Sequence, residues 1–154
     1  MAGAEQSAGS RRDVARGSRR RSRELALQSL YQWLVSGGDT RQLCRDALVE
    51  AAAPRPDEAY FTTLVEGVAQ RRDGLDADLQ PFLDRPAGSL SPIEHVLLLL
   101  GAYELSACAD VPYRVVINEA VELAKSYGGT DGHRYVNGVL DRLAAQIRPH
   151  EFRR

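Results

Sequence analysis

Arginines near the start of the chain are the clearest group of side chains that could do chemistry. Residues 1–23 hold seven of them against only Glu5 and Asp13, a net charge of +5: Arg11, Arg12, Arg16, Arg19, Arg20, Arg21 and Arg23. The remaining 131 residues carry 13 basic and 19 acidic side chains, a net charge of −6. Guanidinium groups pair with phosphates bidentately, so a basic arm on an acidic body predicts a polyanionic partner. A solvated tail without a ligand is the alternative for this composition.

Tyrosines that the apolar pattern does not need form a second group. Tyr31 lies beside the apolar stripe of the first predicted helix, Tyr127 at the end of the fifth, and Tyr135 in the first turn of the sixth, next to His133 and Arg134. Unstacked bases of single-stranded RNA bind on aromatic rings, and nearby cations add to that binding. The basic–aromatic cluster at residues 126–129 and 133–135 therefore predicts a site for a base or backbone of RNA, with partly buried packing residues as the alternative.

No pattern of residues indicates catalysis. His95, His133 and His150 have no ligand spacing to one another or to a cysteine. Cys44 and Cys108 lie far apart without metal or redox spacing, so we expect core or near-surface thiols that stay reduced. No glycine-rich phosphate loop follows a strand, and nothing selects an acid–base pair among 21 carboxylates. We expect no enzyme, no metal site and no cofactor.

Length and composition exclude several further classes. The 154 residues suit one domain, and 44% apolar with 27% charged residues is typical of a globular protein. The longest apolar run, Val96 to Leu100, is far shorter than the roughly 20 residues of a membrane span. The N-terminus has no apolar stretch typical of a signal peptide. We expect a cytoplasmic protein without a membrane partner, and neither a secreted protein nor a disulfide scaffold.

The elements that must position these residues all show helical periodicity. Apolar residues recur at helical spacing, and glycines and prolines separate the segments. The fourth predicted helix is apolar nearly all round and belongs in the middle of the fold. Gly138, inside the sixth, is expected to mark a close helix–helix contact. The first predicted helix ends before residue 37. The other five cover about residues 39–51, 57–79, 91–107, 112–127 and 132–147.

The predicted organisation is a single all-α domain with two terminal segments. Residues 1–17 contain too few apolar side chains to offset the cost of ordering, and we expect a disordered, arginine-rich arm. Residues 18–149 form a helical bundle of about six to seven helices. Pro149 is expected to stop the sixth helix, which leaves residues 150–154 as a C-terminal tail.

Several stretches resemble the NusB family of bacterial transcription antitermination factors. The resemblance runs in order from about residue 19 to residue 149, and leaves out the arm and the divergent loop at 51–56. The segments that carry it are Arg21-Ser-Arg-Glu-Leu-Ala-Leu-Gln-Ser-Leu-Tyr31, Tyr103-Glu-Leu105, Asp110-Val-Pro-Tyr113, Ile117-Asn-Glu-Ala-Val-Glu-Leu-Ala-Lys125 and Tyr135-Val-Asn-Gly-Val-Leu-Asp141.

The resemblance implies a fold and a function. The family has two small helical sub-bundles joined through a central helix, and binds single-stranded boxA RNA of nascent transcripts, in ribosomal RNA operons above all. It acts with NusE, a small-subunit ribosomal protein, in a complex of RNA polymerase and other Nus factors. Carried over by position, the RNA-binding residues are Arg19, Arg20, Arg21, Arg23, Tyr127, Asp131, Arg134 and Tyr135, and the NusE-facing residues are Tyr31 and Glu94.

Alternatives stay open for two acidic residues and for the function. Glu94 either closes a capping box at the start of its helix or faces the partner, and Asp131 is also a candidate N-cap for the sixth helix. The chain is alternatively a NusB-like RNA-binding module that serves an RNA methyltransferase in trans. A third possibility is a helical scaffold that forms a homodimer without RNA.

Overall fold

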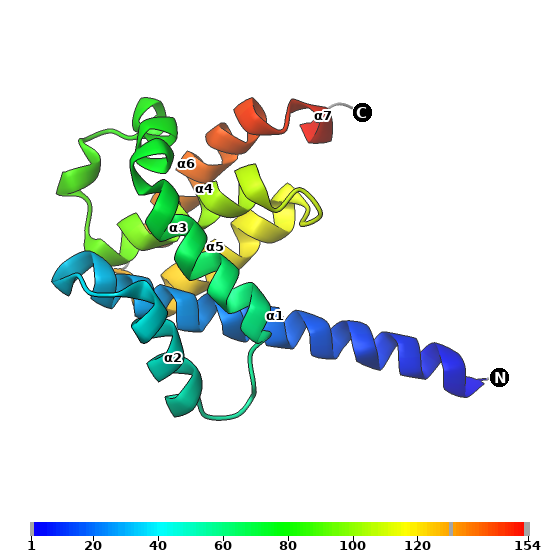
Figure 1. Ribbon diagram of the computed structural model, residues 1–154. Helices are drawn as coiled ribbons and strands as arrows, with labels where there is room; N and C mark the ends of the chain where they lie inside the picture. Colours follow the sequence, from blue (N-terminus) through cyan, green and yellow to red (C-terminus); the bar gives the residue numbers. More distant parts are fainter. Residues whose placement is uncertain (1, 130, 153–154) are drawn as a thin grey trace.

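All secondary structure in the described part of the chain is helical, as the sequence predicts (Figure 1). The computed structural model describes residues 2–129 and 131–152, with side chains from residue 16 onward. Its α-helices are α1 (Ala2–Ser36), α2 (Thr40–Glu50), α3 (Glu58–Leu79), α4 (Pro92–Ala107), α5 (Tyr113–Tyr127), α6 (Gly132–Ile147) and α7 (Pro149–Phe152), with 3-10 turns at Gln80–Phe82 and Ala87–Ser89.

Polar caps and glycines set the ends of these helices. The Asp39 carboxylate accepts a hydrogen bond from Arg41 N at 2.9 Å, and the Asp57 carboxylate accepts one from Tyr60 N at 3.1 Å. Gly37 follows α1 with φ of 74°, a left-handed conformation in which glycine is favoured. These local signals explain why the predicted helix boundaries agree closely with the observed ones.

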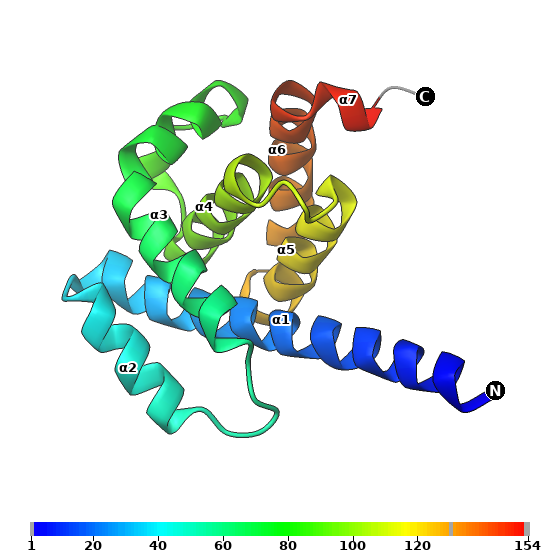
Figure 2. The same cartoon turned by 45° about the vertical axis from the view of Figure 1, so that its right-hand side comes forward.

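The α4 helix is the centre of the fold. Its residues from His95 to Leu105 are all buried, and it contacts α1, α3, α5 and α6. Figure 2 shows α4 between α3 on one side and α5 and α6 on the other. Since α1, α2 and α3 pack on one another and α5 packs on α6, two small groups of helices meet at this central helix. This arrangement confirms the predicted architecture.

Close packing around α4 depends on one glycine of its own. A Cβ atom at Gly101 would lie 2.6 Å from Cδ1 of Leu140, a fully buried side chain of α6. Gly138, expected to mark a close contact, instead has nothing within 4 Å of its Cβ position. That expectation is wrong, because a glycine inside a helix does not reveal which helix face it occupies.

The N-terminal segment differs from the disordered arm expected for residues 1–17. The α1 backbone is helical from Ala2, and its first half extends away from the other helices in both views (Figures 1 and 2). The expectation rested on the shortage of apolar side chains, which limits burial against other elements. Alanine and arginine nevertheless have high helix propensity, and the segment continues a helix that is already nucleated further along the chain.

The C-terminal segment also differs from the predicted tail. Pro149 begins α7, and Arg148 is buried, donating hydrogen bonds to the carbonyl oxygens of Glu104, Leu105, Cys108 and Val111. Glu151 accepts hydrogen bonds from Arg148 at 2.7 Å and from Tyr113 N at 2.9 Å. The predicted tail is therefore docked as far as residue 152, and residues 153–154 lie outside the described range.

Two further features bear on the class of the protein. Cys44 and Cys108 are both buried, as predicted, and burial raises the pKa of the Cys44 thiol to about 11. No helix in the described part of the chain is long and apolar enough to span a bilayer.

Candidate nucleic-acid interface

The arginines at the base of the arm point in different directions. Consecutive residues of an α-helix are rotated by about 100°, so Arg19, Arg20 and Arg21 cannot share one face. In the structure, each of the three pairs with a different part of the molecule. These three of the expected RNA-binding arginines therefore have different surroundings.

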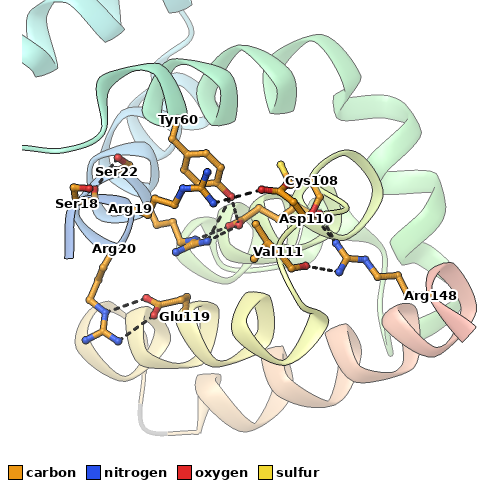
Figure 3. A network of polar contacts seen from close by, with 12 residues as sticks. Ser18, Arg19, Arg20, Ser22, Tyr60, Cys108, Asp110, Val111, Glu119 and Arg148 are labelled. Carbon is orange, nitrogen blue, oxygen red and sulfur yellow. Dashed lines mark hydrogen bonds and ion pairs between the residues drawn. The ribbon is translucent and has the colours of Figure 1, made fainter. Parts of the chain in front are cut away.

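Arg20 is the most exposed of these arginines. Its Nε and Nη2 donate hydrogen bonds to the two carboxylate oxygens of Glu119 on α5, at 3.1 and 3.0 Å. Figure 3 shows this pair at the edge of a polar network. The Arg20 side chain is 67% exposed, whereas that of Glu119 is only 13% exposed. The hydrogen bonds and the charge of Glu119 raise the pKa of Arg20, which stays a cation facing solvent.

Arg19 and Arg21 are more enclosed. The Arg19 guanidinium carbon lies 4.4 Å from the centroid of the Tyr60 ring, and its Nη1 lies 3.8 Å from an oxygen of Asp110. Arg21 forms an ion pair with Glu24 one turn along α1, and its Nη2 donates to the Ala52 carbonyl at 3.5 Å. Arg19 therefore offers a partly open cation beside Arg20, while most of Arg21 is covered.

Arg23 does not fit the predicted role in RNA binding, because it is buried. It is 5% exposed, and its Nε and Nη2 each donate to a carboxylate oxygen of Glu104 at 2.8 Å. Burial alone would lower the pKa of Arg23, but the hydrogen bonds and charge of Glu104 outweigh that effect and raise it. The Tyr60 hydroxyl also donates to Glu104. Arg23 is thus part of an internal ion pair that joins α1 to α4, with no phosphate-accessible edge.

Tyr127 lies against α1, at a distance along the helices from the arginines. Its hydroxyl accepts a hydrogen bond from Gln28 Nε2 at 2.9 Å, and the residue is 38% exposed. The pairs Arg20–Glu119 and Gln28–Tyr127 both join residues that are 99 positions apart. Two side-chain contacts therefore join α1 to α5, and the eight residues from Arg20 to Gln28 span about 12 Å of α1.

A groove of about 620 Å³ lies between α1, α5 and the loop at residues 53–54. Arg20, Arg21 and Glu24 line one wall, and Glu119 and Glu122 line the other. Each of the three carboxylates has a cationic partner, since Glu24 pairs with Arg21, Glu119 with Arg20, and Glu122 with Lys125 at 3.4 Å. The exposed cation at the rim of this groove is Arg20.

Tyr135 contacts a different part of the fold from Tyr127. Its hydroxyl donates to Asp84 Oδ1 at 2.9 Å and accepts from Asp84 N at 3.3 Å, so its ring lies against the linker between α3 and α4. The Arg85 guanidinium carbon lies 5.4 Å from the ring centroid. Hydrogen bonds from Arg85 and Tyr135 lower the pKa of Asp84 to about 2. A base that stacks on Tyr135 must share the ring with Arg85, which sequence analysis placed only in a linker.

Asp131 and Arg134 are both exposed at the start of α6. Asp131 occupies the N-cap position, but its side chain makes no capping hydrogen bond. The capping interpretation of its carboxylate is therefore not supported. The exposed side chains of Asp131 and Arg134 are accessible to a ligand.

Glu94 lies beside the same helix start. Its backbone N–H donates to Ser91 Oγ at 3.3 Å, while no reciprocal bond from its carboxylate to Ser91 N occurs in the described residues. Glu94 Oε1 instead lies 3.0 Å from the position that a Cβ of Gly132 would take. A carboxylate is favoured near a helix N-terminus, so of the two alternatives left open for Glu94 the capping box is not supported, and its carboxylate lies beside the start of α6.

Tyr31 is 40% exposed on α1, and Val35 is exposed one turn further along the same face. A tyrosine and a valine at this spacing form a small apolar surface suited to a protein partner. Sequence analysis missed Val35, although a branched apolar residue next to the helix-ending glycines and off the core stripe was a usable signal.

The amino-acid sequence matches the model of the NusB family over residues 20–145. It is 51% identical over 136 residues to the transcription antitermination protein NusB of Thiobacillus denitrificans, covering 88% of this chain and 94% of that protein. It is 55% identical over 130 residues to NusB of Nitrosospira multiformis, covering 84% and 82% of the two chains. The chain belongs to the NusB family. It is therefore a transcription antitermination factor and not an enzyme.

Solved NusB structures have the same fold. The structure of NusB from T. maritima superposes with a TM-score of 0.77 at 27% identity, covering 87% of this chain and 96% of that one. A crystal structure of the antitermination factors NusB and NusE in complex with double-stranded RNA gives a TM-score of 0.77 at 25% identity, covering 84% and 97%.

Proposed function

We propose that this NusB-family protein binds single-stranded boxA-type RNA in nascent transcripts, those of ribosomal RNA operons above all, together with the ribosomal protein NusE. The observation that carries the RNA and NusE parts of the proposal is the similarity of the whole fold to a NusB that was solved with NusE and double-stranded RNA. In bacteria a nascent transcript lies in the cytoplasm, which is where we place the protein. The complex would act with RNA polymerase and other Nus factors.

Exposed cations support the RNA-binding part of this proposal. Arg20 faces solvent at the rim of the α1–α5 groove, and Arg16 is exposed one turn before it, on the same side of α1. Arg19 is partly open beside them. Phosphate contacts of this kind supply affinity without reading sequence, so they suit the backbone of a transcript.

We assign the base contacts to Tyr127, at the end of α5, and to the residues at the start of α6. The exposed edge of Tyr127 offers a ring for stacking, and the Asp131 carboxylate can accept hydrogen bonds from base amino groups. Arg134 adds a cation in the first turn of α6. Stacking requires unpaired bases, which is why we propose single-stranded RNA as the ligand of this chain.

The proposed NusE surface comprises Tyr31, Val35 and Glu94. Tyr31 and Val35 give exposed apolar area on α1. The Glu94 carboxylate lies beside Gly132 at the start of α6, and Asp131 is the residue before Gly132. A partner that contacts Glu94 would therefore border the proposed RNA residues, and its own side chains could extend the RNA site. Cooperative binding of partner and RNA follows from that proximity.

The decisive experiment measures binding of a boxA-type RNA and a scrambled RNA of equal length to the purified full chain, with and without NusE. We expect weak, salt-sensitive binding of both RNAs to the chain alone, and a preference for the boxA-type RNA when NusE is present. Equal affinity for both RNAs in the presence of NusE would contradict the proposal, and would leave only general RNA binding.

A methyltransferase module has no support from the observations. The matching relatives named as antitermination proteins have nearly the same length as this chain, which covers 94% of one and 82% of another. No feature of the described residues favours a homodimeric scaffold either. The pairing with NusE is therefore the single function we propose.

A further inference from the structure

We propose that Glu119 is a positioning residue for RNA binding: its carboxylate holds the Nε/Nη2 edge of the Arg20 guanidinium so that the adjacent Nη1/Nη2 edge faces a phosphate. The inference rests on the proposed RNA-binding function, and assigns a role to a residue of α5 that the sequence did not single out. Glu119 itself would not touch the RNA.

The hydrogen bonds of Arg20 use only part of its donor set. A guanidinium has five N–H groups in a fixed planar fork. The bonds to Glu119 use Nε–H at 3.1 Å and one N–H of Nη2 at 3.0 Å. The second N–H of Nη2 and one N–H of Nη1 form the other donor edge of the fork, which Glu119 does not use. Two parallel hydrogen bonds to a phosphate are possible on that edge.

The two partners differ in how firmly they are held. The Glu119 side chain is mostly covered, and it precedes the buried Ala120 on a helix that packs on both α4 and α6. The Arg20 side chain is mostly exposed on the rim of the groove. A long exposed arginine loses rotamer freedom when it binds a ligand. An ion pair with a fixed carboxylate restricts that freedom before the RNA arrives.

The alternative role for Glu119 is competition, in which its carboxylate and an RNA phosphate compete for the Arg20 guanidinium. Glu122 makes these two roles separable. It lies on the same wall of the groove, three residues along α5, and its carboxylate pairs with Lys125 and not with Arg20. Both glutamates repel RNA through space, but only Glu119 holds the guanidinium fork.

The test measures the affinity of the full chain, with NusE, for a single-stranded boxA-type RNA by fluorescence anisotropy at fixed low salt. We expect Glu119→Gln to weaken binding about three- to tenfold, because the amide has one acceptor oxygen and no charge and so cannot hold both donors of the fork. The matched control Glu122→Gln removes the same charge from the same groove, and should bind as tightly as the wild type or more tightly. In an Arg20→Ala background, Glu119→Gln should cause no further loss.

Three results would overturn the inference. Binding by Glu119→Gln that equals or exceeds that of the wild type would make the carboxylate inert or a competitor. A further loss in the Arg20→Ala background would show that Glu119 acts through something other than Arg20, including general destabilisation of the fold. Failure of the wild-type chain to bind the RNA would instead overturn the proposed function, and this inference with it.

Discussion

Arg20 and Arg23 lie three residues apart on α1 and have opposite surroundings. Arg20 faces solvent and keeps one edge of its guanidinium open, whereas Arg23 is enclosed with Glu104 and Tyr60 between α1, α3 and α4. Breaking a buried ion pair leaves the remaining charge without a partner in a poorly hydrated site. An exposed ion pair contributes little to stability. The two arginines should therefore separate folding from ligand binding.

We expect Arg23→Ala to lower the free energy of unfolding by about 3–5 kcal/mol, since the Glu104 carboxylate stays buried without its cation. Arg20→Ala should change it by less than about 1 kcal/mol and should weaken RNA binding. Urea denaturation of the two variants measures the first effect, and RNA titration the second. Similar stabilities for both variants would contradict the assignment of Arg23 to an internal ion pair.

The Asp84–Tyr135 contact gives a prediction that depends on pH. Asp84 has its pKa lowered to about 2 by hydrogen bonds from Arg85 and Tyr135, so folding favours the carboxylate form. The contact should be complete above the ordinary value of 3.8 and be lost as the pH falls toward 2. Tyr135→Phe removes one donor and should raise the Asp84 pKa, as measured by carboxyl-carbon NMR. Tyr127→Phe is the control, and an equal shift in both variants would contradict the contact.

Sequence reasoning identified the types of the site residues better than their places. Arg23 was assigned to RNA although it stands three, four and seven positions before Ala26, Leu27 and Leu30, all buried on the core side of α1. Glu104, an acidic residue in the last third of a nearly all-apolar helix, was the matching signal for a buried cation. Glu119 and Arg85 carried no such signal, because only the packing of distant segments brings them to Arg20 and Tyr135.

At the scale of the element, helix boundaries were predictable because their causes are local. Caps, prolines and the Gly37–Gly38 pair act within a few residues of where they stand. Contacts between helices have no such local cause, and the two glycines near the α4–α6 contact illustrate the difference. Gly101 is pressed against Leu140, whereas Gly138 is open, although both interrupt apolar helical patterns in the same way.

Alanine substitutions at these glycines should have opposite effects. Gly101→Ala places a methyl group against the buried Leu140 side chain and should lower stability by about 1–3 kcal/mol. Gly138→Ala meets nothing within 4 Å and should raise stability by about 0.4–1 kcal/mol through higher helix propensity. Thermal unfolding of the two variants, followed by circular dichroism, measures both. A stabilising Gly101→Ala would show that α4 and α6 are further apart than the structure has them.

At the scale of the whole molecule, the structure keeps the charge asymmetry of the sequence, but only some of the arginines are available to bind RNA. The arm is basic and the body acidic, yet Arg20 and Arg21 pair with glutamates and Arg23 is buried. The number of arginines in a segment therefore overstates the number that can hold phosphates. The family and the all-helical architecture were predictable from sequence, because motif and periodicity extend over most of the chain.

The salt dependence of RNA binding should reflect this smaller number. If Arg16, Arg19 and Arg20 each neutralise one phosphate, the slope of log K against log salt should be about −2 for a single strand. Arg20→Ala should reduce its magnitude by about 0.7. Titrations of the chain with RNA at several salt concentrations measure both values. A slope near zero would exclude the arm and groove arginines from the complex.

The unbroken course of α1 has a geometric consequence for the two proposed ligands. Arg20 and Tyr31 are eleven residues apart, which is about three full turns of an α-helix, so they project from nearly the same side at a separation of about 16 Å. The helix geometry thus sets both the distance and the rotation between the residue proposed to contact the transcript and the residue proposed to contact the ribosomal protein. An inserted residue within that span would rotate one binding face by about 100° relative to the other.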